Sequence, residues 1–427
     1  MSTITEKDKA FVWHPFTHLK YAEKPINIVR SEGVYFIDDK ENKIIDAIAS
    51  WWVNLHGHCN PYISEKVAEQ LSINEHSIFS GFTHPNAVIL AERLLKHLPA
   101  NLGKVFYSDN GSTAVEVALK MTLQYWNNKD ATRTTFIAFE NAYHGDTFGG
   151  MSVGERNVFN NAFSPLLFDV ERIPLPTKEN LDDILQQLER ICGKGNCAGF
   201  VFEPLVQGAA GMLMYEASLL DKLIHHCRSH NVLIIADEVM TGFGRTGTFF
   251  ASDQLNNKPD IICLSKGLTG GYMPLGVTAC SNEIYQAFIQ DDKTKTFFHG
   301  HSYTANPTAC SAALASLDLM EEPVTFEHIA RINKSHLQFE SEINKHEACK
   351  DVRVCGTIIA IELSTSDRTH YLNNAAELIS EYFIKRNILL RPLGNVLYVL
   401  PPYCITSAEL DYIYQHIKQF LDAYLKR

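Results

Sequence analysis

The sequence lacks any continuous apolar run that approaches the roughly 20 residues of a membrane span. It also lacks an excess of basic residues: 38 lysines and arginines stand against 49 aspartates and glutamates, a formal net charge of −11. A nucleic-acid partner would favour a basic surface, so this charge argues against one. The first residues, MSTITEKDKA, are polar and lack the apolar core of a secretory signal. We therefore expect a cytoplasmic protein with neither a membrane nor a nucleic acid as partner.

No pair of cysteines has the C-x-x-C spacing, although the chain has ten cysteines. A scattered set of this kind indicates a reducing compartment, where free thiols in apolar runs act as small hydrophobic groups. Only Cys192 and Cys197 lie close together in the sequence. Zinc binding at this pair is one interpretation, but two incidental cysteines in a loop are favoured. No metal site is predicted.

Internal repeats and low-complexity tracts are absent as well. The chain has 427 residues, of which 45% are hydrophobic and 20% charged, and this composition is typical of a globular protein of about two or three domains. From about residue 60 the pattern alternates between helices and strands, which predicts an α/β fold with a mostly parallel sheet. The predicted helices span 62–73, 86–98 and 113–127, and the predicted strands span 104–108, 134–139, 199–203, 232–236 and 261–264.

Both ends of the chain differ from this central pattern. Residues 28–50 predict short strands. The C-terminal part predicts a strand pair at 351–363, a helix at 373–387 and a final amphipathic helix at about 406–425. We predict a large domain of residues 59–320 and a small α+β domain of residues 321–427, which the N-terminal segment 1–58 joins.

Two predicted strands end in residues with complementary chemistry. One apolar run ends at Asp237, and a second ends at Lys266 beside a glycine-rich loop. Ligands of such sheets bind beyond the carboxyl ends of the strands. A lysine there can form a Schiff base with a carbonyl, and a carboxylate can keep a pyridine nitrogen protonated; pyridoxal phosphate (PLP) requires both. Either residue alone is unremarkable in an α/β protein, but the pair favours a PLP site.

A long motif surrounds this pair. It comprises Asp237-Glu238-Val239, Gly242-Phe243-Gly244-Arg245-Thr246-Gly247, Pro259-Asp260 and Ser265-Lys266-Gly267. The motif resembles that of the class III PLP-dependent aminotransferases, which have fold type I. The resemblance implies a mostly parallel, seven-stranded sheet in the large domain and PLP as the cofactor. It also implies that Lys266 holds the cofactor and acts as general base, while Asp237 contacts the ring nitrogen.

A helix start follows the predicted strand 104–108. Thr113 and Glu116 have the spacing of a capping box, with Gly111 just before them. Free N–H groups at a helix N-terminus favour an anion, although a capped helix without a ligand is the simpler interpretation of this motif alone. The family resemblance implies that Gly111 and Ser112 bind the cofactor phosphate.

An aromatic residue, Tyr143, follows the predicted strand 134–139 in the segment AYHGD. Its ring can stack on a planar ligand or simply shield a loop. The resemblance implies that Tyr143 stacks on the pyridoxal ring, takes part in catalysis and contacts the substrate, with Val239 against the opposite face. The signal from His144 is weaker and predicts only a hydrogen-bonding loop residue.

The polar segment FHGHSYTANP, residues 298–307, precedes a helix of small residues. In fold type I dimers the matching loop reaches the neighbouring subunit's phosphate through a threonine, and Ser302 occupies that position here. A serine hydroxyl can still donate a hydrogen bond. The resemblance further implies that His301 contacts the cofactor and Gly300 the substrate. We therefore expect a homodimer with shared active sites.

Three further segments narrow the choice of substrate: WHPFT at 13–17, SWW at 50–52 and RPLG at 391–394. They resemble the biotin-pathway members of the family, which transfer an amino group from S-adenosylmethionine to 8-amino-7-oxononanoate and give 7,8-diaminononanoate. Phe16, Trp51, Trp52 and Arg391 are then the substrate-binding residues. Tryptophans suit a long apolar ligand and an arginine suits a carboxylate, although core packing and a surface ion pair are the alternatives.

One position departs from the family pattern, because Phe16 stands where the family has a tyrosine. The missing hydroxyl leaves the amino donor open between S-adenosylmethionine, which is favoured, and lysine. Another class III omega-aminotransferase, an aminomutase and a catalytically silent PLP-binding protein are the remaining alternatives. The predicted mechanism is ping-pong transamination, in which Lys266 moves a proton between the donor Cα and the cofactor.

Overall fold

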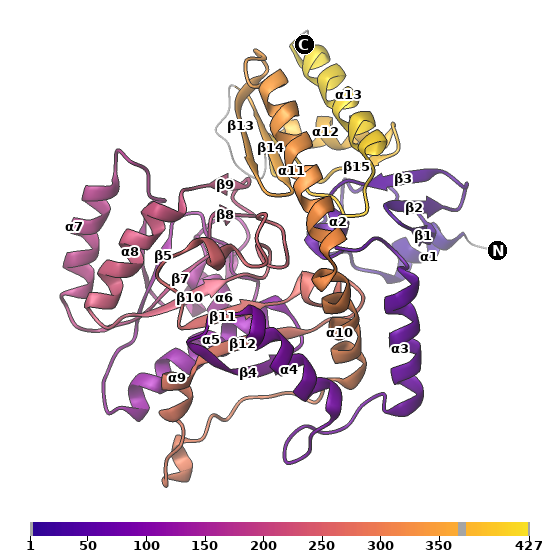
Figure 1. The fold of residues 1–427 in the computed structure, drawn as a ribbon. Helices are drawn as coiled ribbons and strands as arrows, with labels where there is room; N and C mark the ends of the chain where they lie inside the picture. The colour runs from indigo at the N-terminus through magenta and orange to yellow at the C-terminus, as the bar shows by residue number, and fades with distance from the viewer. Residues whose placement is uncertain (1–2, 366–372, 426–427) are drawn as a thin grey trace.

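A computed structural model describes residues 3–365 and 373–425. Its centre, in the described part of the chain, is a seven-stranded sheet with the order β4-β12-β11-β10-β7-β5-β6 (Figure 1). The strands are β4 (Leu102–Ser108), β5 (Thr135–Phe139), β6 (Val170–Ile173), β7 (Cys197–Phe202), β10 (Leu233–Asp237), β11 (Ile261–Leu264) and β12 (Gly276–Ser281). Only β12 runs antiparallel to its neighbours in this sheet. The predicted α/β class with a mostly parallel sheet is confirmed.

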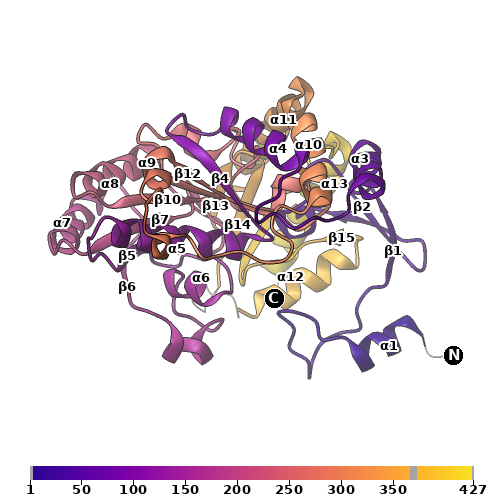
Figure 2. The ribbon, with the colours of Figure 1, turned by 90° about the horizontal axis from the view of Figure 1, so that it is seen from below.

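Helices cover both faces of this sheet, so its inner strands are apolar on both sides. In β10, Ile235 packs with helix α5 (Gly111–Asn128) on one face, whereas Ile234 and Ala236 pack in the core of the other face. That second core contains α4 (Pro85–His97), α7 (Leu181–Cys192) and α8 (Ala217–Ser229). Figure 2 shows α4 and α5 on opposite sides of the strands. The predicted helices 86–98 and 113–127 are thus confirmed as covering helices.

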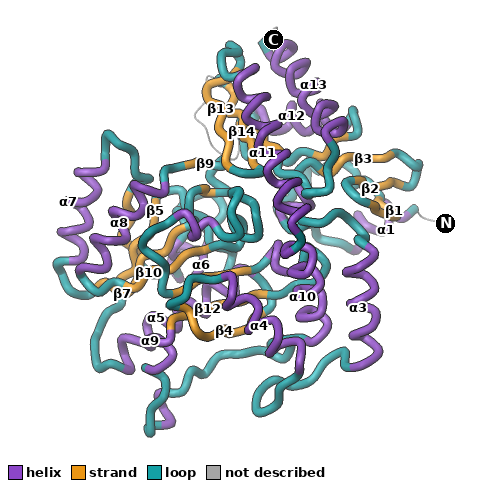
Figure 3. Tube along the Cα trace, viewed as in Figure 1, coloured by secondary structure: helices purple, strands orange, loops and turns teal. Residues whose placement is uncertain are grey.

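The two ends of the chain meet beside the large sheet (Figure 3). The N-terminal strands β1 (Ile28–Glu32), β2 (Tyr35–Asp38) and β3 (Lys43–Asp46) form a sheet with β15 (Ile388–Leu389), which pairs parallel to β3. The predicted strand pair at 351–363 is an antiparallel hairpin of β13 (Cys349–Cys355) and β14 (Ile358–Leu363), and β16 (Val396–Val399) extends it. The pairing of β3 with β15 supports an N-terminal segment joined to the C-terminal unit. The boundaries at residues 58 and 320 stay a prediction.

The remaining elements connect these units. They are the helices α1 (Ile4–Phe11), α3 (Pro61–Ile73), α6 (Phe148–Val153), α9 (Asn282–Gln286), α10 (Pro307–Glu321), α11 (Pro323–Ile343), α12 (Ala375–Ile384) and α13 (Ser407–Tyr424), and the short strands β8 (Val206–Gln207) and β9 (Leu213–Met214). Helix α1 buries none of its residues and lies apart from the sheet in Figure 2. Among the described residues, no helix combines the length and the apolar composition that a membrane crossing needs.

Two local predictions are wrong. The strand predicted to run to residue 50 ends at Asp46, and α2 (Ala49–Trp52) follows as a left-handed turn with φ of 49° to 76°. The capping box at the start of α5 joins Asn110 and Thr113 instead of Thr113 and Glu116. The helix begins earlier than expected because Asn110 is itself a good N-cap, and the Glu116 carboxylate accepts from the backbone N–H of Gly149.

Candidate active site

The carboxyl ends of four parallel strands, β4, β7, β10 and β11, converge with the loop after β5 on one cavity of about 470 Å³. Each strand is followed directly by residues that line this cavity, as expected for an open α/β sheet. Seven of the residues predicted for the site are among them: Trp52, Gly111, Ser112, Tyr143, Asp237, Val239 and Lys266. The structure therefore brings together the lysine, the carboxylate and the helix N-terminus that the sequence placed far apart.

Lys266 follows β11 with a left-handed backbone, φ 46°, which a residue with a side chain rarely adopts. Its Nζ lies 4.8 Å from the centre of the Trp52 ring. Burial lowers the pKa of Lys266, while the charges of Asp237 and Glu203 act to raise it. A lowered pKa makes a neutral amine more accessible, and this is the form that attacks a carbonyl.

The carboxylate of Asp237 at the end of β10 is buried, and each of its oxygens has one protein partner. Its Oδ2 lies 2.8 Å from Nδ1 of His144, and its Oδ1 accepts from the backbone N–H of Val239 at 3.1 Å. Burial acts to lower the pKa of His144, but the hydrogen bond and the charge of Asp237 outweigh it and raise the pKa. His144 therefore fixes the orientation of Asp237. The sequence predicted only a loop role for His144; its place directly after Tyr143 was the available signal.

A second carboxylate, Glu203, lines the same cavity and was missed in the sequence. Its two oxygens accept from the backbone N–H groups of Tyr143 and Gly208 at 3.2 and 2.9 Å. Burial, together with the charge of Asp237, raises its pKa to about 7. Glu203 thus anchors the backbone that carries Tyr143. Its signal was the same as that of Asp237, an acidic residue directly after an apolar strand.

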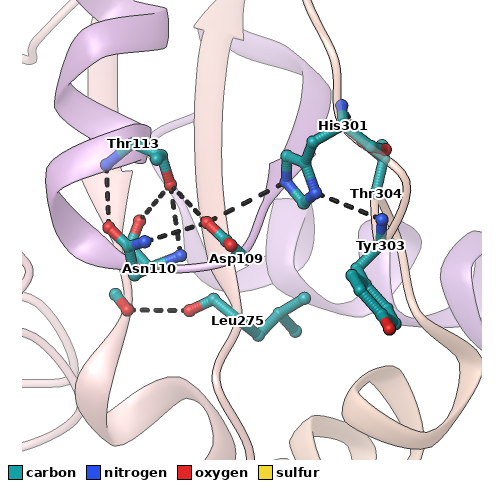
Figure 4. A network of polar contacts seen from close by, with 8 residues as sticks. Asp109, Asn110, Thr113, Leu275, His301, Tyr303 and Thr304 are labelled. Carbon is teal, nitrogen blue, oxygen red and sulfur yellow. Dashed lines mark hydrogen bonds and ion pairs between the residues drawn. The ribbon is translucent and has the colours of Figure 1, made fainter.

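The N-terminus of α5 forms an anion cradle. Asn110 Oδ1 accepts from the N–H of Thr113 at 2.9 Å, so the earlier N–H groups of Gly111 and Ser112 are not used by the cap (Figure 4). A Cβ on Gly111 would lie 2.6 Å from Cγ1 of Val239. A Cβ on Gly145 would lie 2.1 Å from the Ser112 hydroxyl oxygen. Only glycines allow this close approach of backbone around the cavity.

The predicted loop residues Gly300, His301 and Ser302 do not line the cavity of one chain. His301 Nε2 is 3.9 Å from Asp109, at the rim of the cavity, and His301 Nδ1 accepts from the N–H of Tyr303 at 3.2 Å (Figure 4). Gly300 and Ser302 are exposed. The structure therefore places this loop beside the site and directs two of its predicted residues outward.

A second cavity, of about 380 Å³, opens on the other side of Lys266 and has mostly apolar walls. Its lining includes Phe16, Trp51, Trp52, Tyr143, Phe159, Leu393 and Lys266. Phe16 packs edge-on against Trp51 and Phe159, with ring centres 5.4 and 5.9 Å apart. The guanidinium of Arg391 lies 4.2 Å over the Trp51 ring. Four of the six predicted substrate-binding residues, Phe16, Trp51, Trp52 and Tyr143, thus line this cavity, and a fifth, Arg391, lies on the Trp51 ring.

A buried arginine holds this wall in place. The Arg245 guanidinium donates to the carbonyl oxygens of Trp52, Asn54 and Pro401 at 3.3, 2.9 and 2.9 Å. Trp52 ends the left-handed turn α2, and its Nε1 donates to the Tyr398 hydroxyl at 3.0 Å. A left-handed turn of residues with side chains is strained and persists only where its surroundings fix it. Arg245 supplies that constraint.

Comparison with known proteins agrees with this geometry. Residues 18–421 match the family model of class III aminotransferases. The chain is 46% identical over 419 residues to the adenosylmethionine-8-amino-7-oxononanoate aminotransferase of Synechococcus elongatus, covering 96% of this chain and 98% of that protein. It is 40% identical over 432 residues to the protein of the same name from Geobacter sulfurreducens, with 96% and 95% covered.

Solved structures give the same result. The adenosylmethionine-8-amino-7-oxononanoate aminotransferase of Methanocaldococcus jannaschii superimposes with a TM-score of 0.93 at 36% identity and 98% coverage of both chains. An amine transaminase of an uncultivated Pseudomonas species, in its PLP-bound form, superimposes with a TM-score of 0.89 at 31% identity, covering 96% and 98%. The chain belongs to the class III aminotransferases. It is an enzyme of a PLP-dependent class.

The residues of the first cavity fit PLP. A lysine amine suits the aldehyde, a buried carboxylate suits the ring nitrogen, and the helix N-terminus of α5 suits the phosphate. Gly111 lies against Val239 and Gly145 against Ser112, so these glycines bring the backbone close to two residues that line the cavity. The cavity therefore has a matching partner for each part of the cofactor.

Proposed function

We propose that this enzyme transfers an amino group from S-adenosylmethionine to 8-amino-7-oxononanoate, which gives 7,8-diaminononanoate on the route to biotin. The names of its relatives support this reaction. The structural observation that carries it is the meeting of two cavities at Lys266: the first is the more polar and holds the carboxylates of Asp237 and Glu203 (the polar cavity), and the second is mostly apolar (the apolar cavity). The first suits the cofactor, and the second suits a substrate with a long hydrocarbon chain.

In this proposal the polar cavity holds PLP through its own residues. Lys266 binds the aldehyde, Gly111 and Ser112 bind the phosphate, and Tyr143 and Val239 enclose the ring. When bound, PLP supplies an aldehyde that condenses with amines and a ring that accepts electrons. Asp237, oriented by His144, keeps a proton on the ring nitrogen.

Lys266 moves the proton in each half-reaction. With its amine free and neutral, Lys266 would take a proton from the donor Cα as general base. Burial lowers the pKa of Lys266, which favours the neutral form that this step needs. In the second half-reaction the same amine returns a proton at the carbon that carried the 7-keto group of the acceptor.

The apolar cavity orients the substrates. Trp51, Trp52 and Phe16 form an apolar wall for the hydrocarbon chain, and Arg391 lies at the edge of this wall on Trp51. Among the described residues, no carboxylate pairs with Arg391. Both substrates carry a carboxylate, so Arg391 can bind each of them in turn.

Product analysis tests this proposal. Purified enzyme is incubated with 8-amino-7-oxononanoate and either S-adenosylmethionine or lysine, and 7,8-diaminononanoate is detected by mass spectrometry. We expect product with S-adenosylmethionine. If product forms with lysine and not with S-adenosylmethionine, lysine is the amino donor. If an enzyme that carries PLP forms no product with either donor, 8-amino-7-oxononanoate is not the acceptor.

We also propose a homodimer in which Gly300, His301 and Ser302 of each subunit complete the other subunit's site. Support comes from exposed apolar residues near this loop: Phe82, Phe298 and Tyr303 are 67%, 74% and 64% exposed. The loop between α3 and α4 and the segment leading into α10 lie together along the lower edge of the molecule in Figure 1. Apolar patches of this kind mark protein interfaces.

Sedimentation of two matched variants tests the dimer. Phe82→Glu places a charge on the proposed interface, and Leu337→Glu places one on α11, at a position 49% exposed. We expect Phe82→Glu to sediment as a monomer with little activity and Leu337→Glu to remain an active dimer. A fully active monomer would refute shared sites.

We further propose a reducing, cytoplasmic setting. All ten cysteines are free thiols in the structure. Cysteines that are neighbours in space, such as Cys192 and Cys197, remain unlinked, which suits such a compartment.

A further inference from the structure

A group of potential metal ligands lies far from the active site. It is formed by Glu189 near the end of α7 and by His226 and His230 at the end of α8. Figures 1 and 2 both show α7 and α8 side by side at the outer edge of the large sheet. The two histidines are four residues apart at the end of one helix, so their rings share a face.

The ligand atoms converge on one point. Nε2 of His226 and Nε2 of His230 lie 3.3 and 3.1 Å from the same carboxylate oxygen, Oε2 of Glu189. All three ligand atoms lie within 4.8 Å of one another. Ligand atoms bound to zinc at about 2.0–2.2 Å in a tetrahedron lie roughly 3.3–3.6 Å apart. The three atoms therefore need only a small adjustment to share one ion.

A simple ion pair does not account for this arrangement. Nε2 of His226 is buried yet makes no hydrogen bond of good geometry within the described residues. A buried imidazole nitrogen that makes no well-aligned hydrogen bond, and that lies beside a carboxylate oxygen, is available as a metal ligand.

We propose that Glu189, His226 and His230 bind a divalent transition-metal ion of the zinc type, with water as the fourth ligand. Imidazole nitrogen selects this class of ion over calcium or magnesium, which prefer oxygen ligands only. The ion would join the ends of α7 and α8, whose buried faces are in contact through the thiols of Cys192 and Cys227. This site is independent of the transamination reaction, and it lies outside the motifs that the sequence highlighted.

Zinc titration of the holoenzyme, produced without a histidine tag and stripped with a chelator, tests the proposal. Bound zinc is counted by mass spectrometry after dialysis, and affinity is measured by calorimetry. The variants are His230→Ala and Glu189→Gln, and the matched control is His225→Ala. His225 lies on the same helix, is exposed and is not part of the group.

We expect one zinc per chain in the wild type and in His225→Ala, with affinity at least about tenfold weaker in His230→Ala and Glu189→Gln. We also expect zinc to raise the melting temperature of the wild type and of His225→Ala but not of the two ligand variants. Turnover should be equal in all four proteins, which shows that each one folds. Equal zinc binding in all four proteins, or no binding by the wild type at micromolar zinc, would overturn the proposal.

Discussion

The buried Arg245 offers the sharpest test of how the substrate wall is built. It is 1% exposed, and its guanidinium donates to three carbonyl oxygens around the left-handed turn α2. The perturbation is Arg245→Met, which has a similar length and no donor. It removes these three hydrogen bonds and leaves the carbonyl groups of Trp52, Asn54 and Pro401 without them.

The magnitude follows from these contacts. Each buried carbonyl left unpaired costs about 1–3 kcal/mol. Removal of the buried guanidinium charge offsets part of this cost, because that charge is itself poorly solvated. We therefore expect the free energy of unfolding to fall by about 3–5 kcal/mol. The turn Ala49–Trp52 itself stores strain of roughly 4–8 kcal/mol at about 1–2 kcal/mol per residue. Once released, it should relax and displace Trp51 and Trp52. We therefore expect KM to rise for both substrates.

Urea unfolding followed by tryptophan fluorescence measures the stability, and steady-state kinetics measures KM. The control is Arg93→Met, which removes half-exposed ion pairs to Asp318 and Glu321 and should cost at most about 1 kcal/mol. Arg245→Lys keeps the charge but loses the planar set of donors, so it should recover stability only in part. Unchanged stability and unchanged KM in Arg245→Met would refute the argument that this residue holds the turn.

Four further predictions concern the site itself. Lys266→Ala should fold but show no turnover and no cofactor that borohydride fixes to the chain; a fixed cofactor would contradict the assignment. Asp237→Asn should reduce kcat by at least about 100-fold with little change in melting temperature, because the charge at the ring nitrogen is lost; near-normal kcat would leave Asp237 a structural residue. Arg391→Ala should weaken both half-reactions by about 2–5 kcal/mol in single-turnover kinetics, and an effect on one substrate alone would indicate separate carboxylate sites. Phe16→Tyr should speed the S-adenosylmethionine half-reaction by about 0.5–1.5 kcal/mol and the acceptor half-reaction less; an equal change in both would contradict a donor-specific role.

Local pattern was enough to find the two residues that define the chemistry. Asp237 and Lys266 each follow a short apolar run, and such runs predict buried strands because only a covered sheet accommodates them. The alternation of helices and strands then favours a mostly parallel sheet, in which the two strands that carry these residues end at the same edge. Five of the seven strands, the covering helices α4 and α5 and the position of this pair were therefore predictable from the sequence, whereas β6, β12, α7 and α8 were not predicted.

What only the tertiary structure decided are contacts between distant residues. His144 and Asp237 are 93 residues apart, and Arg245 is 193 residues from Trp52, so no local pattern could pair them. The predicted strand ran to residue 50 and so included the first two residues of the left-handed turn, because the apolar sequence suits a strand; surrounding contacts, Arg245 among them, override that preference. Likewise, Glu189 joins His226 and His230 only because α7 packs against α8. Short-range hydrophobic patterning fixes the elements of this protein, whereas burial and the pairing of distant polar groups fix its sites.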